Sequence, residues 1–289
     1  MRIRATVAAV SGALALSALA VPASQAAQSH DDLPAITSFG FPAQDRAAAP
    51  KAKGLAASKA AAALPVISKV VVNGGKPIVV GTTATKKVSI AITASHRSGI
   101  ADAATFLWFS KDAATDMYYG FEQNEDAATC KAASATTSTC TLSVTVDPWY
   151  LINEGATYWK TAAFVLSNES DITENFTATK IRMQRLSKLD VNASPEPVKK
   201  GKTITVTGKL SRANWDTGTY KGYATQDVKL QFRKKNSSTY TTVKTVKGSS
   251  TGTLKTTVKA VEDGYWRWSF AGTASTPAVS ATGDFVDVK

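Results

Sequence analysis

The 289-residue chain has little of what enzymes use most often for catalysis. It contains two histidines and two cysteines, and it has no G-x-S-x-G, H-E-x-x-H or phosphate-cradling glycine motif. His30 lies in a predicted linker, and His96, in TASHRSG, has no cysteine or carboxylate at a recognisable spacing, so we interpret it as an ordinary turn residue. The order of a Ser-His-Asp triad varies among folds, which leaves that arrangement open. The composition predicts a protein that is not an enzyme and carries no cofactor.

Long apolar runs are also scarce, and the one that exists lies at the N-terminus. Arg2 and Arg4 precede the uncharged run ATVAAVSGALALSALAV, and the small residues of ASQAAQ follow Pro22. This order is typical of a signal peptide, residues 1–26, cleaved after Ala26. A membrane anchor is the alternative, but a spanning helix needs about 20 apolar residues. No comparable run and no hydrophobic tail follow, so we expect a secreted, extracellular protein whose mature form has no membrane span.

The cysteine pair predicts a structural bond. Cys130 and Cys140 frame KAASATTST, and an even cysteine count in an exported protein favours a disulfide. A metal site would need more ligands, no histidine lies nearby, and a redox pair is more typically C-x-x-C. We expect the bond to join two neighbouring strands, to stabilise the fold by about 2–3 kcal/mol, and to hold no metal.

Acidic residues are fewer than basic ones, and the imbalance lies mostly in one half of the chain. The whole chain has 22 acidic and 34 basic residues, a net charge of +12. Residues 187–289 have 8 acidic and 17 basic residues, a net charge of +9. The C-terminal half therefore carries most of the positive field.

Texture divides the chain into parts. Alanine, lysine and proline dominate residues 27–64, which cannot bury a core and are predicted to be a disordered linker or pro-segment. From Pro65 onward, runs rich in valine, isoleucine, threonine and aromatic residues alternate with turn signals at the spacing of a β-sandwich. A weak internal repeat indicates two copies of one plan, with a boundary near Leu186–Ser187. The matching positions are Pro77 and Pro197, Gly81 and Gly201, and Tyr158-Trp159 and Tyr265-Trp266.

The two copies resemble known modules. The stretch NASPEPVKKGKTITVTGKL, with VKLQFRKK and DGYWRWSFAGT after it, resembles immunoglobulin-like modules of secreted actinobacterial, Streptomyces-type proteins. The first copy is similar to a domain of unknown function in the same kind of exported protein. The resemblance covers about residues 65–289 and implies no catalytic residue. The predicted fold is all-β: two tandem immunoglobulin-like β-sandwiches, residues 65–186 and 187–289.

Alternation along three strands predicts a core and an outer face in the second sandwich. In EDGYWRWSFAG, Trp266, Trp268 and Phe270 share one side and are predicted to be buried. The opposite side, with the matching sides of VKLQFRKK and DFVDV, gives an outer patch that combines cations with aromatic rings. The patch consists of Lys229, Arg233, Tyr265, Arg267 and Phe285. Such a patch suits an anionic polymer, while the alternative is a solvated basic face whose rings pack against the first domain.

Three loops of the first domain offer further candidates. FEQNEDAATC and SNESDITEN are rich in carboxylates, and we interpret them as polar loops. The alternatives are that they bind a structural calcium ion or supply the paired carboxylates of a glycosidase. In DPWYLINEG, residues 147–155, we expect a short helical turn that crosses between the sheets and plugs the end of the core. An exposed aromatic loop that stacks on carbohydrate is the alternative.

The sequence thus predicts a secreted, non-enzymatic binding or spacer protein. Its basic second domain would face an anionic cell-wall polymer or polysaccharide, with no specific nucleic-acid partner. The alternatives are a purely structural extracellular module, a calcium-stabilised module, and a protease inhibitor that uses loops of the first domain.

Overall fold

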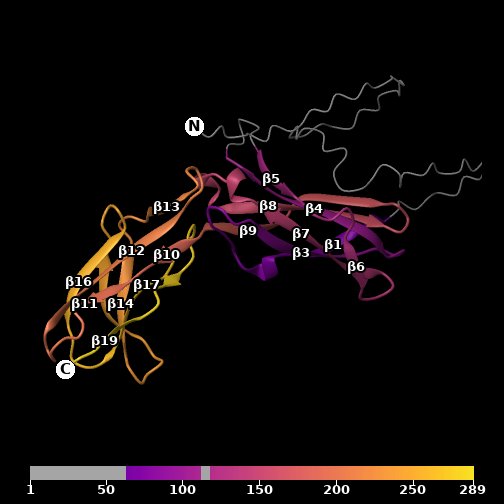
Figure 1. The fold of residues 1–289 in the computed structure, drawn as a ribbon. Helices are drawn as coiled ribbons and strands as arrows, with labels where there is room; N and C mark the ends of the chain where they lie inside the picture. Colours follow the sequence, from indigo (N-terminus) through magenta and orange to yellow (C-terminus); the bar gives the residue numbers. More distant parts are fainter. Residues whose placement is uncertain (1–62, 112–117) are drawn as a thin grey trace, which may run out of the picture.

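The structure, a computed structural model, describes residues 63–111 and 118–289, and these form an all-β protein (Figure 1). Within those ranges the only helices are short 3-10 turns, and no helix is long and apolar enough to cross a membrane. The predicted signal peptide and nearly all of the predicted linker lie outside the described residues. The predicted fold class, two β-sandwiches, is confirmed.

The first sandwich packs a four-stranded sheet, in the order β1-β3-β7-β6, against a five-stranded sheet, in the order β2-β9-β8-β4-β5. Its strands are β1 (Val66–Val72), β2 (Ile78–Val80), β3 (Lys86–Ser95), β4 (Ile100–Ser110), β5 (Tyr118–Glu122), β6 (Thr129–Ala132), β7 (Thr137–Val146), β8 (Tyr158–Ser167) and β9 (Ile172–Arg185). Its 3-10 turns are η2 (Asn73–Gly75), η3 (Pro148–Tyr150) and η4 (Asn153–Gly155).

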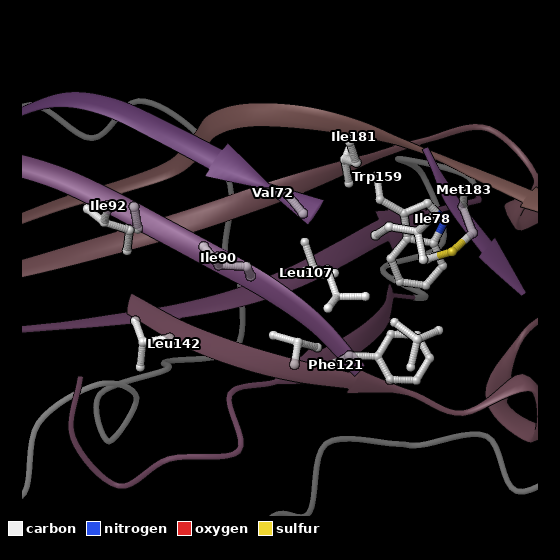
Figure 2. Close-up of a cluster of buried hydrophobic side chains, with 14 of the residues drawn as sticks. Val72, Ile78, Ile90, Ile92, Leu107, Phe121, Leu142, Trp159, Ile181 and Met183 are labelled. Atoms are coloured by element: carbon white, nitrogen blue, oxygen red, sulfur yellow. The ribbon is translucent and has the colours of Figure 1, made fainter. Parts of the chain in front are cut away.

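Strict alternation of apolar and polar residues builds this core. In β3, KKVSIAITAS, the side chains of Val88, Ile90 and Ile92 are fully buried while their neighbours face outward. Figure 2 shows Ile90 and Ile92 near Leu142 of β7, the neighbouring strand of the same sheet, with Trp159 of β8, from the opposite sheet, at one end of the cluster. The Trp159 indole donates a hydrogen bond of 2.8 Å to the carbonyl oxygen of Gly155, which satisfies its only polar group.

The second sandwich is built in the same way from shorter strands. They are β10 (Ser187–Leu189), β11 (Asn192–Ser194), β12 (Thr203–Asn214), β13 (Thr219–Gly222), β14 (Asp227–Lys234), β15 (Thr241–Lys247), β16 (Thr253–Lys259), β17 (Gly264–Phe270), β18 (Val279–Ser280) and β19 (Asp284–Val286). One sheet centres on β12, and the other has the order β15-β14-β17-β18, with β19 also paired to β17. Trp266, Trp268 and Phe270 are buried, which confirms their predicted direction. The Trp268 indole lies so close to Gly208 that a Cβ there would clash.

The two sandwiches lie end to end and are joined by direct contacts (Figure 1). Trp215, which follows β12 of the second sandwich, is packed into the core of the first. Its indole nitrogen donates to the carbonyl oxygen of Gly81 at 2.9 Å. The buried Arg185 donates from Nε to the carbonyl oxygen of Ala213 at 2.6 Å, and burial, with the charge of Arg212 nearby, lowers its pKa to about 10.

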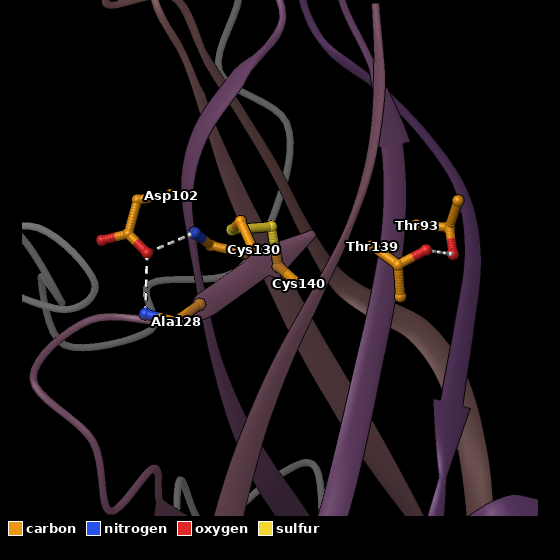
Figure 3. The surroundings of a disulfide bond; sticks show 7 residues. Thr93, Asp102, Ala128, Cys130, Thr139 and Cys140 are labelled. Atoms are coloured by element: carbon orange, nitrogen blue, oxygen red, sulfur yellow. Dashed lines mark hydrogen bonds between the residues drawn. A yellow bond between two sulfur atoms is a disulfide. The ribbon is translucent and has the colours of Figure 1, made fainter. Parts of the chain in front are cut away.

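The disulfide joins directly opposed residues of β6 and β7, as predicted. Figure 3 shows Cys130 and Cys140 beside Asp102, whose carboxylate accepts a hydrogen bond of 2.8 Å from the amide of Ala128. β6 is short and lies at the edge of its sheet. The bond therefore holds an edge hairpin against the sheet.

Candidate polyanion-binding face

Three neighbouring strands of the second sandwich bring the predicted patch together. β17 pairs with β14 on one side and with β19 on the other. In this register Tyr265 lies opposite both Arg233 and Phe285, and Arg267 lies opposite Gln231. Because directly opposed side chains on one face of a sheet lie close together, the register alone forces contact among them.

The side chains form a stack in which cations and rings alternate, and we call it the cation–aromatic ladder: Arg267, Tyr240, Arg233, Tyr265 and Phe285. The guanidinium carbon of Arg267 lies 3.7 Å from the ring centre of Tyr240, and that of Arg233 lies 3.7 Å from the ring centre of Tyr265. Arg233 also lies 5.4 Å from the Tyr240 ring, and the rings of Tyr265 and Phe285 are 5.1 Å apart. All five side chains are partly buried. The aromatic rings of the patch thus pack within the second sandwich, which makes the alternative packing against the first domain wrong.

Neither arginine of the ladder has an acidic partner within 4.0 Å among the described residues. Arg267 donates from Nε to the side-chain oxygen of Gln231 at 2.9 Å, and Arg233 donates from Nη1 to the carbonyl oxygen of Ser237 at 2.8 Å. These neutral acceptors hold the guanidinium groups in place without compensating their charge. The ladder is therefore a fixed, uncompensated positive surface.

At its other end the ladder is flanked by an ion pair. The ammonium of Lys235 lies 5.4 Å from the centre of the Phe285 ring and 3.5 Å from the carboxylate of Asp263. A hydrogen bond from the Val288 amide lowers the pKa of the Asp263 carboxyl. This cation is thus compensated at neutral pH, unlike the two arginines.

The structure adds Tyr240 and Lys235 to the predicted patch and leaves Lys229 at its margin. Lys229 is exposed and lies opposite Ser269, two positions along β14 from Gln231, so it extends the charge without joining the stack. Tyr240 lies before β15, in the loop that follows β14, and its hydroxyl occupies the space where a Cβ of Gly283 would be. Gly283 is therefore what admits Tyr240 to the ladder.

His96 lies in a more specific environment than a turn residue needs. Its side chain is buried, and Nε2 lies 2.6 Å from the carbonyl oxygen of Ala63 and 3.5 Å from the carboxylate of Asp171. A carbonyl only accepts, so Nε2 carries the proton and Nδ1 accepts from the Ser98 hydroxyl at 2.7 Å. No sequence pattern indicated this contact between His96 and Asp171, because the two residues lie far apart along the chain.

This cluster also includes Glu169, and its three side chains could surround an ion. Both nitrogens of His96 are already engaged, however, and Glu169 forms an exposed ion pair with Arg97 at 2.7 Å. A metal ion would have to displace these partners. The other acidic loop is likewise engaged: the Glu125 carboxylate accepts hydrogen bonds from the amide and the hydroxyl of Ser143.

The aromatic loop differs in part from its prediction. As expected, η3 and η4 cross from β7 in one sheet to β8 in the other, and Leu151 is buried in the core. Trp149 and Tyr150 do not plug the core, since they are 53% and 42% exposed. The expected turn is present, but the prediction was wrong for these two residues, because successive residues of a 3-10 turn point in different directions and only Leu151, at the end of η3, enters the core.

A comparison with protein families matches part of the first sandwich. Residues 79–165 are similar to the Family of unknown function (DUF5707). A search of curated proteins found no match.

A comparison with solved structures found similar chains at low sequence identity. The match to the fibronectin(III)-like modules of Clostridium thermocellum CbhA covers 76% of this chain and 93% of that chain, at 10% identity and a TM-score of 0.35. The match to the D00-D0 domain of intimin covers 75% of this chain and 99% of that chain, at 15% identity and a TM-score of 0.27. The match to the adhesin InvE of Yersinia pseudotuberculosis covers 75% of this chain and 58% of that chain, at 12% identity and a TM-score of 0.25.

Proposed function

We propose that this protein is an extracellular, non-enzymatic binding protein whose second sandwich binds an anionic polymer of the cell envelope through the cation–aromatic ladder. The observation that carries the proposal is the pair Arg233 and Arg267, each stacked on a tyrosine ring and each without a carboxylate partner in the described part of the chain. A partner with repeated negative charges would supply the missing counter-charges.

Stacking prepares the arginines for such a partner. A guanidinium has several N–H donors in one plane, and the ladder engages only Nε of Arg267 and Nη1 of Arg233 with protein acceptors. The remaining donors suit the oxygens of phosphate or carboxylate groups. Because the stack already restricts both side chains, binding costs less conformational entropy than it would for free surface lysines.

Net charge acts at longer range. The second half of the chain carries +9, and Lys229 adds an exposed cation at the margin of the ladder. A field of this sign attracts a polyanion before contact and weakens as salt screens it, within about 10 Å at 0.1 M ionic strength. The disulfide supports an oxidising, extracellular location, in line with the predicted signal peptide.

Co-sedimentation with isolated Gram-positive cell walls across a salt series tests the proposal. We expect binding that falls with salt and is weakened by at least about tenfold in the variant Arg233→Gln, Arg267→Gln, which loses two charged hydrogen-bonding groups. The matched control is Lys255→Gln, Lys259→Gln, because both lysines are exposed on β16 in the opposite sheet and the net charge changes equally.

Two outcomes would contradict the proposal. Equal weakening in both variants would show that net charge, and not the ladder, attracts the polymer. An absence of binding at every salt concentration would show that the ladder does not bind cell-wall polymer.

A second candidate function, that of a rigid spacer, is favoured by the junction. Asn153 of the first sandwich donates from its side chain to Asn214 at 3.0 Å and to Asp216, and Gln184 donates to the carbonyl oxygen of Thr273 at 3.1 Å. Such contacts hold two domains at one angle. Small-angle X-ray scattering of the secreted protein would fit a single conformer if the spacer function is right, and would need a broad ensemble if it is wrong.

A further inference from the structure

A cavity of about 400 Å³ lies at the junction of the two sandwiches. One wall is the cavity segment, residues 81–86, which comprises the loop after β2 and the first residue of β3, and the opposite wall comes from β10 and β13 of the second sandwich. Its volume lies within the range typical of small-molecule sites, about 300–1,000 Å³, but it is open to solvent on one side, since Thr83, Thr85, Lys86 and Lys188 are exposed. The cavity exists only because both sandwiches contribute to it.

The charged groups that line the cavity are all positive. They are Lys86 from the first sandwich and Lys188 from the second, and no aspartate or glutamate belongs to the lining. Neither ammonium has a carboxylate within 4.0 Å in the part of the chain that the structure describes. The Lys188 ammonium is held 3.7 Å from the centre of the Tyr220 ring, at the cavity wall. An anion between these lysines would be attracted by both.

Hydroxyl groups make up most of the remaining polar lining. The threonines at positions 82, 83 and 85 and the phenol of Tyr220 line the cavity, and none of these hydroxyls has a hydrogen-bond partner within the described residues. Burial raises the pKa of the Tyr220 phenol, so the group stays a neutral donor and acceptor at physiological pH. Hydroxyls of this kind pair well with the hydroxyls of a sugar or a polyol.

The walls are fixed by the same contacts that join the domains. The Trp215 indole nitrogen donates to the carbonyl oxygens of Val80 and Gly81, at the start of the cavity segment. A Cβ on Gly81 would lie 3.2 Å from the Tyr220 hydroxyl, so the small residue allows the two walls to approach. The contacts that join the domains therefore hold both walls of the cavity in place before any ligand binds.

We propose that the junction cavity binds a sugar or polyol that carries one anionic group, phosphate or carboxylate. The anionic group lies between Lys86 and Lys188, and the hydroxyls of the ligand face the threonines and Tyr220. This site is separate from the cation–aromatic ladder, and the proposal stands whether or not the ladder binds a polymer.

Amide chemical shifts of the intact, isotope-labelled protein, titrated with small probes, test this site. The probes are glycerol 3-phosphate, glucuronate, inorganic phosphate and glucose. We expect saturable shifts at residues 81–86, Lys188 and Tyr220 with one or both of the first two probes, and the stronger of them identifies phosphate or carboxylate as the anionic group. Lys86→Gln, Lys188→Gln should weaken that binding by at least about tenfold, since it removes both charged donors. The control Lys255→Gln, Lys259→Gln should not.

Tyr220→Phe tests the polyol half of the proposal without removing a charge. It keeps the ring beneath Lys188 and removes only the hydroxyl, so it should weaken glycerol 3-phosphate or glucuronate and leave inorganic phosphate unchanged. The proposal is overturned if no anionic probe gives saturable shifts at the cavity. It is likewise overturned if Lys86→Gln, Lys188→Gln and the control Lys255→Gln, Lys259→Gln bind the probe equally well. It is also overturned if glucose or inorganic phosphate binds as tightly as the better charged polyol.

Discussion

The two sandwiches follow one plan but treat their outer faces differently. In the first, the outer side of β4 and β8 is covered by its own aromatic cluster, in which Phe164 is 2% exposed and packs against Phe106 and Phe176. In the second, the outer side of β14 and β17 carries the cation–aromatic ladder, which stays partly exposed. One face has become a second small core, and the other has kept its charges in contact with solvent.

A local change of register accounts for the covered face. β8 and β9 pair regularly except between Thr161 and Ala163, whose partners on β9 are Thr179 and Asn175. The extra residues on β9 bulge outward and carry Phe176 over the sheet, where its carbonyl oxygen accepts a hydrogen bond of 2.8 Å from the Trp108 indole. β19 is too short to do this in the second sandwich.

The repeated tyrosine shows the same divergence. Tyr158 and Tyr265 each lie opposite an arginine on the neighbouring strand, and each ring stacks with it, at 4.0 Å for Arg182 and 3.7 Å for Arg233. Arg182 also donates to the carbonyl oxygen of Ala274 across the junction. One copy of the pair thus helps to join the domains, while the other remains partly exposed on the face of its own sandwich.

The largest expected effect separates the covered face from the open one. Phe164→Ala should lower the free energy of unfolding by about 3–5 kcal/mol, because it removes a buried ring from between Phe106 and Phe176. Tyr265→Ala should cost clearly less, since its ring is partly exposed and its neighbours can move into solvent. Urea denaturation of both variants gives the two values, and equal costs would show that the ladder is a core like its counterpart.

The sequence predicted the parts of this comparison that depend on alternation. The buried direction of Trp266, Trp268 and Phe270 followed from the period of two, as did the outward direction of Tyr265 and Arg267. The disulfide followed from cysteine count and expected compartment.

The residues that were missed depend on register or on contacts between distant segments. Tyr240 joins the ladder through the pairing of β14 with β15, which contains an irregularity between Leu230 and Gln231 that alternation cannot locate. Trp215, in NWDTG, reads as part of a turn, and nothing in its neighbourhood indicates that its indole enters the other domain. The junction cavity follows from that contact, so it could not be predicted either.

An intermediate effect is expected from the disulfide, which only the first sandwich has. Reducing it should lower the stability of that sandwich by about 2–3 kcal/mol, since the Cys130–Cys140 bond closes a short loop between β6 and β7. Hydrogen exchange followed by mass spectrometry on peptides from each half measures the change. Faster exchange confined to the first sandwich is the expected result, and equal acceleration in both would mean that the junction makes them unfold as one unit.

The smallest expected effect compares one carboxylate in each sandwich. Burial would raise the pKa of the Glu125 carboxyl, but hydrogen bonds from the Ser143 hydroxyl and amide bring it below its ordinary value of 4.5, and the Val288 amide likewise lowers the pKa of Asp263. A carboxyl whose pKa is lower in the folded state stabilises the fold above its unfolded pKa, and that contribution is lost as pH falls through the folded value. In a plot of the urea midpoint against pH, Glu125→Gln and Asp263→Asn should each slightly reduce the fall at acid pH and leave the slope near neutral pH unchanged. Because both side chains are partly exposed, the two changes should be similar in size. A much larger effect in either variant would reveal a sandwich whose acid stability depends on one carboxylate, which its hydrogen bonds alone do not predict.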